Sequence, residues 1–176
     1  MGRRRADWLT AGIAAGLLGL VGCGGGTNTS TVTTTAPAGS TTSQVALPSK
    51  AEYIAQADDI CSTYRPKIAA LQSDAETAIR NGEVERAVVS LAHGNDLVYE
   101  ELGRLEALQV PAGDAGTISS MLGKVRFASD VFKHALGPLR AGDNQQATAL
   151  FNEAQSETDK ARGMAEAYGF KVCGQN

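Results

Sequence analysis

The stretch SKAEYIAQADDICSTYRPKIAALQSDAETAIRNG, residues 49–82, decides the fold of this chain. Its apolar residues recur at alternating spacings of three and four, which is the period of one face of an α-helix. They are Ile54, Ala57, Cys61, Tyr64, Ile68, Leu71, Ala75 and Ala78. Ser49 and Glu52 have the spacing of a capping box, which predicts that the helix begins there. Pro66 lies inside this helix and predicts a kink between Ser62 and Pro66.

Three further segments with the same helical period follow. They cover about Val84 to Leu108, Asp114 to Leu139 and Asp143 to Tyr168. Val110-Pro111-Ala112-Gly113 ends the first of them, and Gly137-Pro138 predicts a bent or frayed end for the second. No stretch alternates as a half-buried strand does. Four amphipathic helices joined by short loops predict an all-α, up-down-up-down four-helix bundle over residues 49–176.

Two turns of this predicted bundle have related sequences. Residues 80–87 and 140–147 share an arginine, a glycine, an acidic residue and an alanine at an offset of 60. Glycine closes a helix in the left-handed conformation, and an acidic residue favours the start of the next one. Common turn chemistry explains the likeness, and ancestral duplication is the alternative. Either way both turns lie at the same end of the bundle.

The first 23 residues have the pattern of an export signal. Arg3, Arg4 and Arg5 precede an apolar run from Leu9 to Val21, and Leu20-Val21-Gly22 precedes Cys23. The run is shorter than the roughly 20 apolar residues that a membrane-spanning helix needs. We therefore expect a cleaved signal peptide over residues 1–22 and a lipid on Cys23. A spanning anchor and a secretory signal without lipidation are the alternatives.

Residues 23–48 join the predicted lipid to the predicted bundle. They are rich in threonine, serine, glycine and alanine and have almost no bulky side chains, which predicts a disordered tether. The whole chain has 16 basic and 19 acidic residues. Cleavage after residue 22 would remove Arg3, Arg4, Arg5 and Asp7, so the mature chain would have 13 basic and 18 acidic residues and a net charge of −5. This acidic balance argues against nucleic acid as a partner, and it leaves membrane attachment to the lipid.

The other two of the three cysteines are Cys61 and Cys173. An even pair in an oxidising, extracytoplasmic compartment favours a disulfide. Gly169 would end the fourth helix and let Phe170 to Cys173 turn back along the first one. That return brings Cys173 to the height of Cys61, so the bond is geometrically sensible.

Two further sequence motifs, together with the features above, resemble those of a known group of proteins. Ala57-Asp58-Asp59-Ile60-Cys61 near the start of the helical domain and Gly169-Phe170-Lys171-Val172-Cys173-Gly174 at its end accompany the lipobox-like tetrapeptide and the Thr/Ser tether. Together they resemble small actinobacterial lipoproteins of the mycobacterial type. The resemblance covers essentially the whole chain. It implies a lipid-anchored location and a disulfide-linked helical domain, and it supplies no catalytic residues.

The candidate ligand-binding residues lie around the middle of the second predicted helix. Asn95 falls on the apolar face, where a buried amide needs hydrogen-bond partners. One interpretation pairs it across the core with Thr158, Ser129 or Tyr64, which would fix the helix register. The other makes it the polar floor of an internal pocket. The residues of that possible pocket are His93, Asn95, Asp96, Tyr64 and Tyr99.

Other kinds of site have little support in the sequence. With only two histidines and both remaining cysteines assigned to a disulfide, we expect no metal site and no cofactor. The acidic pairs Asp58-Asp59 and Glu100-Glu101 are adjacent in sequence, so the two side chains of each pair point about 100° apart on a helix and do not form a carboxylate dyad. We interpret them as solvated residues on the helix surface. Lys124, Arg126, Lys133 and Arg140 are expected to face acids on neighbouring helices.

These observations predict a lipid-anchored protein on the extracytoplasmic face of the cell membrane. The expected role is a non-enzymatic binding or interaction module of the cell envelope, attached through Cys23 and binding an envelope protein or a small ligand. The alternative is a carrier of a small apolar ligand, which predicts an internal cavity of several hundred Å³. An enzyme centred on His93 is the least favoured hypothesis.

Overall fold

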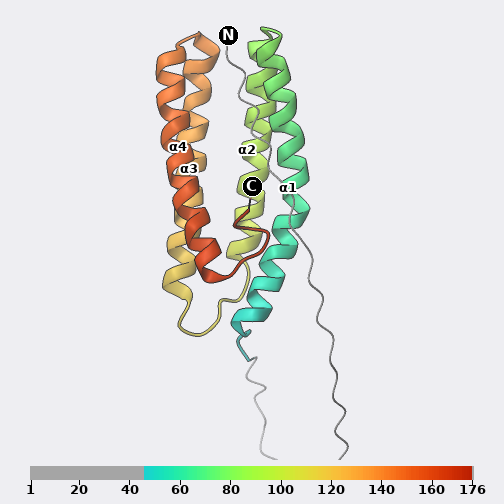
Figure 1. Cartoon of the computed structure of the whole chain (residues 1–176), viewed down its shortest axis with the longest axis vertical. Coiled ribbons are helices and arrows are strands. Elements are labelled where there is room, and N and C mark those ends of the chain that lie inside the picture. The colour runs from blue at the N-terminus through green and yellow to red at the C-terminus, as the bar shows by residue number, and fades with distance from the viewer. Residues whose placement is uncertain (1–45, 176) are drawn as a thin grey trace, which may run out of the picture. The chain divides into compact units, whose positions relative to one another are not determined.

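Four antiparallel α-helices make up most of the described part of the computed structural model, residues 46–175. They are α1 (Lys50–Arg80), α2 (Val84–Glu106), α3 (Ala115–Ala141) and α4 (Asn144–Tyr168), and they run up-down-up-down (Figure 1). The predicted all-α four-helix bundle is confirmed. The predicted signal peptide and Cys23 lie outside the described residues.

The sequence sets the beginning of α1 through its capping box. The Ser49 hydroxyl accepts the Glu52 N–H at 3.3 Å, and the Glu52 carboxylate accepts the Ser49 N–H at 2.8 Å. Two backbone donors that the first helical turn cannot use are thereby satisfied. The predicted helix start is confirmed.

Two similar glycine turns close the helix pairs at one end of the bundle. Gly82 and Gly142 both have φ of 76°, which glycine adopts without steric cost. After each glycine an acidic residue donates its N–H back to the preceding helix, Glu83 to Ala78 O at 2.8 Å and Asp143 to Pro138 O at 2.9 Å. We call this the distal end, and the opposite end, where α1 begins, the proximal end (Figure 1).

The two prolines inside helices behave differently. Pro66 lies within the continuous helix α1, which changes direction near its middle (Figure 1), in agreement with the predicted kink. The sequence predicted that Gly137-Pro138 would bend or fray the end of α3, but the helix does not fray there. Helix α3 continues through Pro138 to Ala141 and ends at Gly142 in the left-handed conformation. The turn of Gly142 therefore sets the helix end, and Pro138 is tolerated one turn before it.

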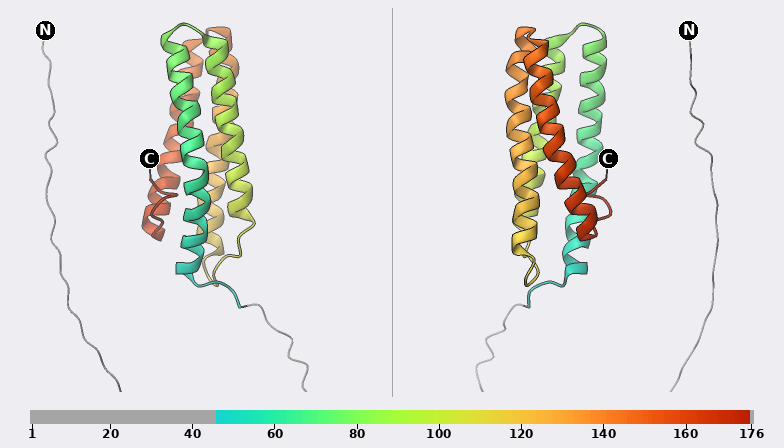
Figure 2. Two further views of the ribbon diagram at one scale, coloured as in Figure 1. Left: turned by 90° about the vertical axis from the view of Figure 1, so that its right-hand side faces the viewer. Right: turned by 60° about the vertical axis from the view of Figure 1, so that its left-hand side comes forward.

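The bundle consists of two helical hairpins, α1–α2 and α3–α4 (Figure 2). Within the described residues, α1 packs on α2, α2 on α3 and α3 on α4. No Cα atom of α1 lies within 8 Å of a Cα atom of α4. Helix packing therefore closes three sides of the bundle. The α1–α4 side is closed by the C-terminal segment, which is described below.

The main hydrophobic core lies toward the proximal end and draws on all four helices. Its largest fully buried side chain is Tyr53, which is 1% exposed and contacts the rings of Tyr168 and Phe170 edge-on. The predicted inward faces are largely confirmed, with two exceptions. Val84 is 40% exposed, and Thr158 is exposed with its hydroxyl donating to Ala154 O of its own helix. Tyr53 itself was missed because it lies beside the predicted stripe.

Candidate functional site

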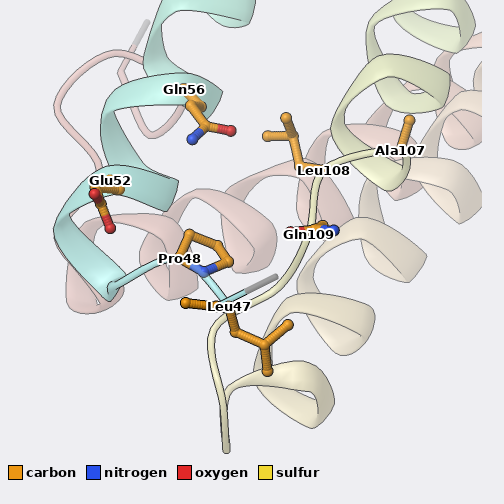
Figure 3. A pocket seen from close by; sticks show the side chains of 8 residues that line it. Leu47, Pro48, Glu52, Gln56, Ala107, Leu108 and Gln109 are labelled. Carbon is orange, nitrogen blue, oxygen red and sulfur yellow. The ribbon is translucent and has the colours of Figure 1, made fainter. Parts of the chain in front are cut away.

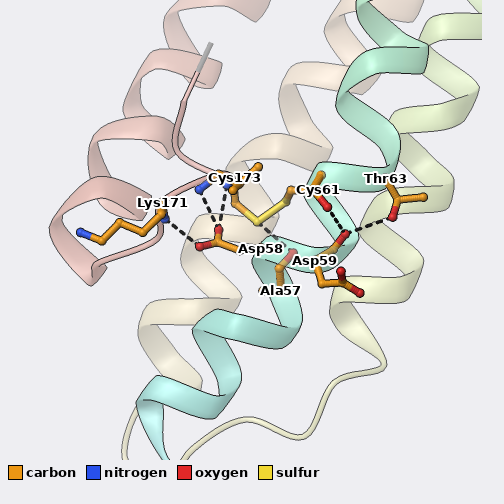
Figure 4. Close-up of a disulfide and its surroundings, with 9 residues drawn as sticks. Ala57, Asp58, Asp59, Cys61, Thr63, Lys171 and Cys173 are labelled. Atoms are coloured by element: carbon orange, nitrogen blue, oxygen red, sulfur yellow. Dashed lines mark hydrogen bonds between the residues drawn. A yellow bond between two sulfur atoms is a disulfide. The ribbon is translucent and has the colours of Figure 1, made fainter.

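A disulfide between Cys61 and Cys173 closes the α1–α4 side of the bundle. The two Cα atoms are 5.3 Å apart, so the predicted pairing is confirmed (Figure 4). Gly169 ends α4 with φ of 111°, and the chain then turns back along α1 as expected. A Cβ on Gly174 would approach the Glu166 backbone nitrogen to 3.2 Å, so this return is tightly packed. The C-terminal segment, residues 169–175, is thus fastened to α1.

Asp58 holds the same segment through three hydrogen bonds. Its carboxylate accepts the backbone N–H groups of Lys171, Val172 and Cys173 at 2.8, 2.9 and 3.0 Å (Figure 4). Three consecutive amides aimed at one carboxylate form an anion-binding nest that the chain fills itself. The sequence interpretation of Asp58 as a solvated acid is therefore wrong, while its neighbour Asp59 is exposed. The two motifs that carried the resemblance form one interlocked unit.

Replacement of Asp58 by asparagine is expected to destabilise the protein by about 1–2 kcal/mol, because hydrogen bonds to a charged acceptor are the strong ones and an amide cannot accept all three N–H groups as well. Asp59→Asn, one position away on the exposed surface, is the matched control and should change the unfolding free energy by less than about 0.5 kcal/mol. Urea unfolding with the disulfide intact measures both. Equal effects of the two substitutions would contradict the role of Asp58.

Asn95 and Tyr99 are brought together where α2 faces α3. Asn95 is 6% exposed and donates through Nδ2 to the Ser129 carbonyl oxygen at 3.3 Å. Tyr99 donates to the Asp130 carboxylate, and burial together with this carboxylate raises the pKa of Tyr99 to about 12. Of the predicted partners of Asn95, Ser129 is the one found, through its backbone. This contact supports the interpretation in which Asn95 fixes the register of α2 against α3.

The other three predicted ligand-binding residues do not join this pair. Tyr64 is 3% exposed and lies on α1, with the cationic groups of Lys67 and Arg104 at 5.4 and 5.7 Å from its ring centre. His93 and Asp96 are exposed on α2. A common ligand pocket for all five residues stays a prediction, and none of the five lines the hollows described next.

The first hollow lies at the proximal end, where the chain enters α1. Its volume is about 510 Å³, and Figure 3 shows Leu47 and Pro48 on one side and Leu108 on the other. Glu52 and Gln56 of α1 add polar groups. Leu47 is 57% exposed. The hollow is partly open to solvent and has a mixed polar and apolar lining.

The second hollow lies between the end of α2 and the beginning of α3. It has a volume of about 380 Å³. Its apolar floor contains Leu105, Ile118 and Leu122, each no more than 8% exposed. Glu106 and Arg126 line it as well and form an ion pair at 2.6 Å. Both hollows were missed by sequence analysis, because helical periodicity does not report the shape of helix ends.

Of the four basic residues of α3 that were expected to face acids, Lys124, Arg126 and Arg140 pair with acids on neighbouring helices. Lys124 pairs with Glu157 of α4 at 3.2 Å, and Arg140 pairs with Glu85 of α2 at 2.8 Å. The Arg140 guanidinium holds the pKa of the Glu85 carboxyl below its usual value. Exposed pairs of this kind contribute little stability, so we interpret them mainly as orienting the hairpins.

Comparison with known protein families, with curated proteins and with solved structures finds no match. Within residues 46–175, no cluster of three histidine, cysteine or acidic residues has the arrangement of a metal site. Among the helices of that same part of the chain, none is long and apolar enough to cross a membrane.

Proposed function

We propose that this protein is a membrane-anchored, extracytoplasmic lipoprotein. Its helical domain acts as a non-enzymatic binding or interaction module of the cell envelope. The observation that carries the proposal is the use of the three cysteines. Cys61 and Cys173 pair with each other, and Cys23, directly after Leu20-Val21-Gly22, remains for acylation. Disulfides persist in oxidising compartments, which agrees with an exported domain.

The position of the domain in the chain also supports this proposal. The described chain enters at the proximal end through Leu47 and Pro48. The residues between Cys23 and Pro48 have the composition of a flexible linker, whose root-mean-square reach would be about 25–30 Å. A lipid on Cys23 would then retain the domain at the membrane while leaving its surface accessible to partners.

Lipidation is tested by metabolic labelling with a clickable fatty acid in a bacterial host that expresses the full-length chain. The wild-type protein is expected to incorporate the label and to sediment with membranes. Cys23→Ser should lose nearly all label and leave the membrane fraction. Protease added to intact cells from which the outer layers have been removed should degrade the domain. A labelled Cys23→Ser variant, or an unlabelled wild type, would contradict the proposal.

A carrier of a small apolar ligand is the second candidate. The two hollows have volumes of 510 and 380 Å³, the size range of small-molecule sites, although both lie at the surface of the helical domain and not inside it. Native mass spectrometry of the exported protein separates the two candidates. A reproducible adduct that dissociates on denaturation would favour the carrier, and a clean mass would favour the interaction module.

A further inference from the structure

The two ends of the bundle differ in charge. At the proximal end, residues 46–49 and 107–117 contain one ionisable side chain, Asp114. The two turns of the distal end, residues 80–86 and 140–144, contain six, which are Arg80, Glu83, Glu85, Arg86, Arg140 and Asp143. The Asp114 carboxylate accepts the Tyr168 hydroxyl at 2.6 Å, so this acid is already hydrogen-bonded within the domain. The proximal end therefore loses less hydration than the distal end when it enters a less polar environment.

The charged side chains next to these proximal segments have partners within the domain. The Lys50 ammonium group lies 4.1 Å from the centre of the Tyr168 ring. The Glu52 carboxylate accepts the Ser49 N–H at 2.8 Å. Neither group depends on an outside partner of opposite charge.

Apolar side chains are accessible at the same end. Leu47 is 57% exposed, and it lines the first hollow together with Pro48 and Leu108 (Figure 3). The second hollow also lies at this end, with the partly buried Val110 beside its apolar floor. The proximal end thus combines a projecting leucine, two hollows with apolar lining and almost no charge.

The predicted tether leads to this end. The described chain begins at Ala46, 23 positions after Cys23. A flexible linker of this length has a root-mean-square reach of about 25–30 Å. Helix α1 has 31 residues and is therefore about 46 Å long. A lipid on Cys23 would thus hold the proximal end closer to the bilayer, on average, than the distal turns.

We propose that the proximal end of the bundle binds the surface of a lipid bilayer through Leu47, Leu108 and the rims of the two hollows. The leucine side chains enter the boundary between headgroups and acyl chains, where they are removed from water. The chain has a net charge of −3, so this contact depends on apolar burial and not on attraction to anionic headgroups. The bundle then stands on the membrane with its charged distal turns facing away from it.

The contact is small and is expected to be weak for a domain free in solution. Attachment through Cys23 converts it into an intramolecular contact with a high effective concentration. In this respect the inference rests on the proposed function. It adds an orientation to that function, because it states which end of the module meets the membrane and which end is presented to partners.

An environment-sensitive fluorophore on one introduced cysteine tests the contact. Gln109→Cys places the label at the first hollow, and Asn81→Cys places it on a distal turn as the matched control, since both side chains are exposed and uncharged. The other cysteines of the chain are the acylated Cys23 and the paired Cys61 and Cys173. The full-length chain is expressed in a bacterial host, and the lipidated protein is reconstituted on phosphatidylcholine vesicles.

On these vesicles the label at position 109 should shift its emission to the blue, gain about twofold or more in intensity, and be quenched by nitroxide-labelled lipid. The label at position 81 should keep the emission that it has in water. Anionic phosphatidylglycerol in the vesicles should leave the signal at position 109 equal or weaker. An unchanged label at 109, equal signals at 109 and 81, or a signal that requires anionic lipid would contradict the contact.

A second substitution tests Leu47 itself. Leu47→Asp, added to Gln109→Cys, should lower the ratio of docked to undocked domain by about tenfold, because it removes an apolar side chain and adds a charge that must be dehydrated. Val89→Asp is the matched control, since Val89 is also aliphatic and is 58% exposed. An intact Cys61–Cys173 bond and an unchanged helical circular dichroism signal show that both variants are folded. An undiminished signal in Leu47→Asp, or equal losses in the two variants, would overturn the proposal.

An artificial anchor separates this inference from the lipoprotein proposal. Residues 1–22 are replaced by a histidine tag, Cys23 is changed to serine, and the labelled chain is held on vesicles that contain nickel-chelating lipid. A docked position 109 on this anchor, in a chain that cells do not acylate, supports the contact and contradicts lipidation. Acylated, membrane-bound protein whose position 109 stays in water on both anchors overturns the contact alone.

Discussion

Loss of the Cys61–Cys173 disulfide is expected to lower the unfolding free energy by about 4–5 kcal/mol, because the bond closes a loop of more than 100 residues and so restricts the unfolded chain. The two cysteines are 112 positions apart. For a domain of this size the corresponding fall in melting temperature is about 10–20 °C. Thermal unfolding of the exported protein with and without a phosphine reductant measures it.

Reduction of the disulfide should also increase local unfolding of the folded state near the C-terminal segment. The C-terminal segment and its bond to Cys61 close the side of the bundle where the backbones of α1 and α4 do not pack closely. Hydrogen exchange after reduction should therefore increase first in residues 160–173. The α1–α2 turn at the distal end should keep its protection. A uniform loss of protection along all four helices would contradict this local role.

A matched variant separates the bond from the packing around it. Cys61→Ala with Cys173→Ala removes the bond permanently, and the reductant should then have no further effect on this protein. Cys61 is 6% exposed, so the substitution also deletes some buried volume. The double variant should therefore unfold at or slightly below the midpoint of the reduced wild type. An unchanged melting temperature in either experiment would show that the disulfide does not stabilise the fold.

Sequence periodicity predicted the four helices and their order because each helix has its own apolar stripe and its own end signals. The capping box of Ser49 and the glycine turns at Gly82 and Gly142 act locally, so they are visible in the sequence. The pairing of Cys61 with Cys173 was predicted from an even pair of cysteines in an exported domain, and helix lengths and one glycine showed it to be geometrically sensible. These features depend on neighbours a few residues away or on simple counting along helices.

Periodicity could not predict how closely two facing stripes approach. The absence of close packing between α1 and α4 depends on all four helices together. The Asp58 nest depends on the path of the C-terminal segment, which no helical pattern describes. The second hollow depends on small residues at positions 115, 119 and 123 beside the end of another helix. Tertiary geometry of this kind gives no local signal.

The burial of Glu101 was also missed by sequence analysis. Glu100 and Glu101 were both interpreted as solvated, yet Glu100 is exposed and Glu101 is partly buried. Glu101 lies on the edge of the apolar stripe of α2, three residues after Val98 and four before Leu105. At the offset of 60 that relates the two turns, its counterpart on α4 is Ala161, which is 3% exposed. A carboxylate thus occupies a position that its counterpart fills with a methyl group.

Burial raises the pKa of the Glu101 carboxyl from 4.5 to about 7. Within the described residues this carboxyl has no hydrogen-bond or ion-pair partner that would offset the loss of hydration. Below the unfolded-state pKa of 4.5 both states are protonated and Glu101 carries no ionisation penalty. As the pH rises from there toward 7, the unfolded state ionises first, so stability falls and then levels off.

Glu101→Gln is therefore expected to stabilise the protein at about pH 8 and to leave it nearly unchanged at about pH 4. A shift of this size corresponds to at most about 3 kcal/mol, and partial exposure reduces the expected gain to about 2 kcal/mol. Urea unfolding of wild type and variant at the two pH values measures the difference. The neighbouring substitution Glu100→Gln is the control and should change the unfolding free energy equally at both.

The outcome also decides between two roles for a buried acid. If the gain at high pH appears, Glu101 lowers the stability of the folded domain at neutral pH, and its carboxylate is retained for a reason other than folding. If Glu101→Gln destabilises the protein at both pH values, the carboxylate has a stabilising partner and the burial argument is wrong. A gain of equal size in Glu100→Gln would instead indicate general relief of negative charge on α2. Only the pH-dependent gain confined to position 101 supports a desolvated carboxyl at Glu101.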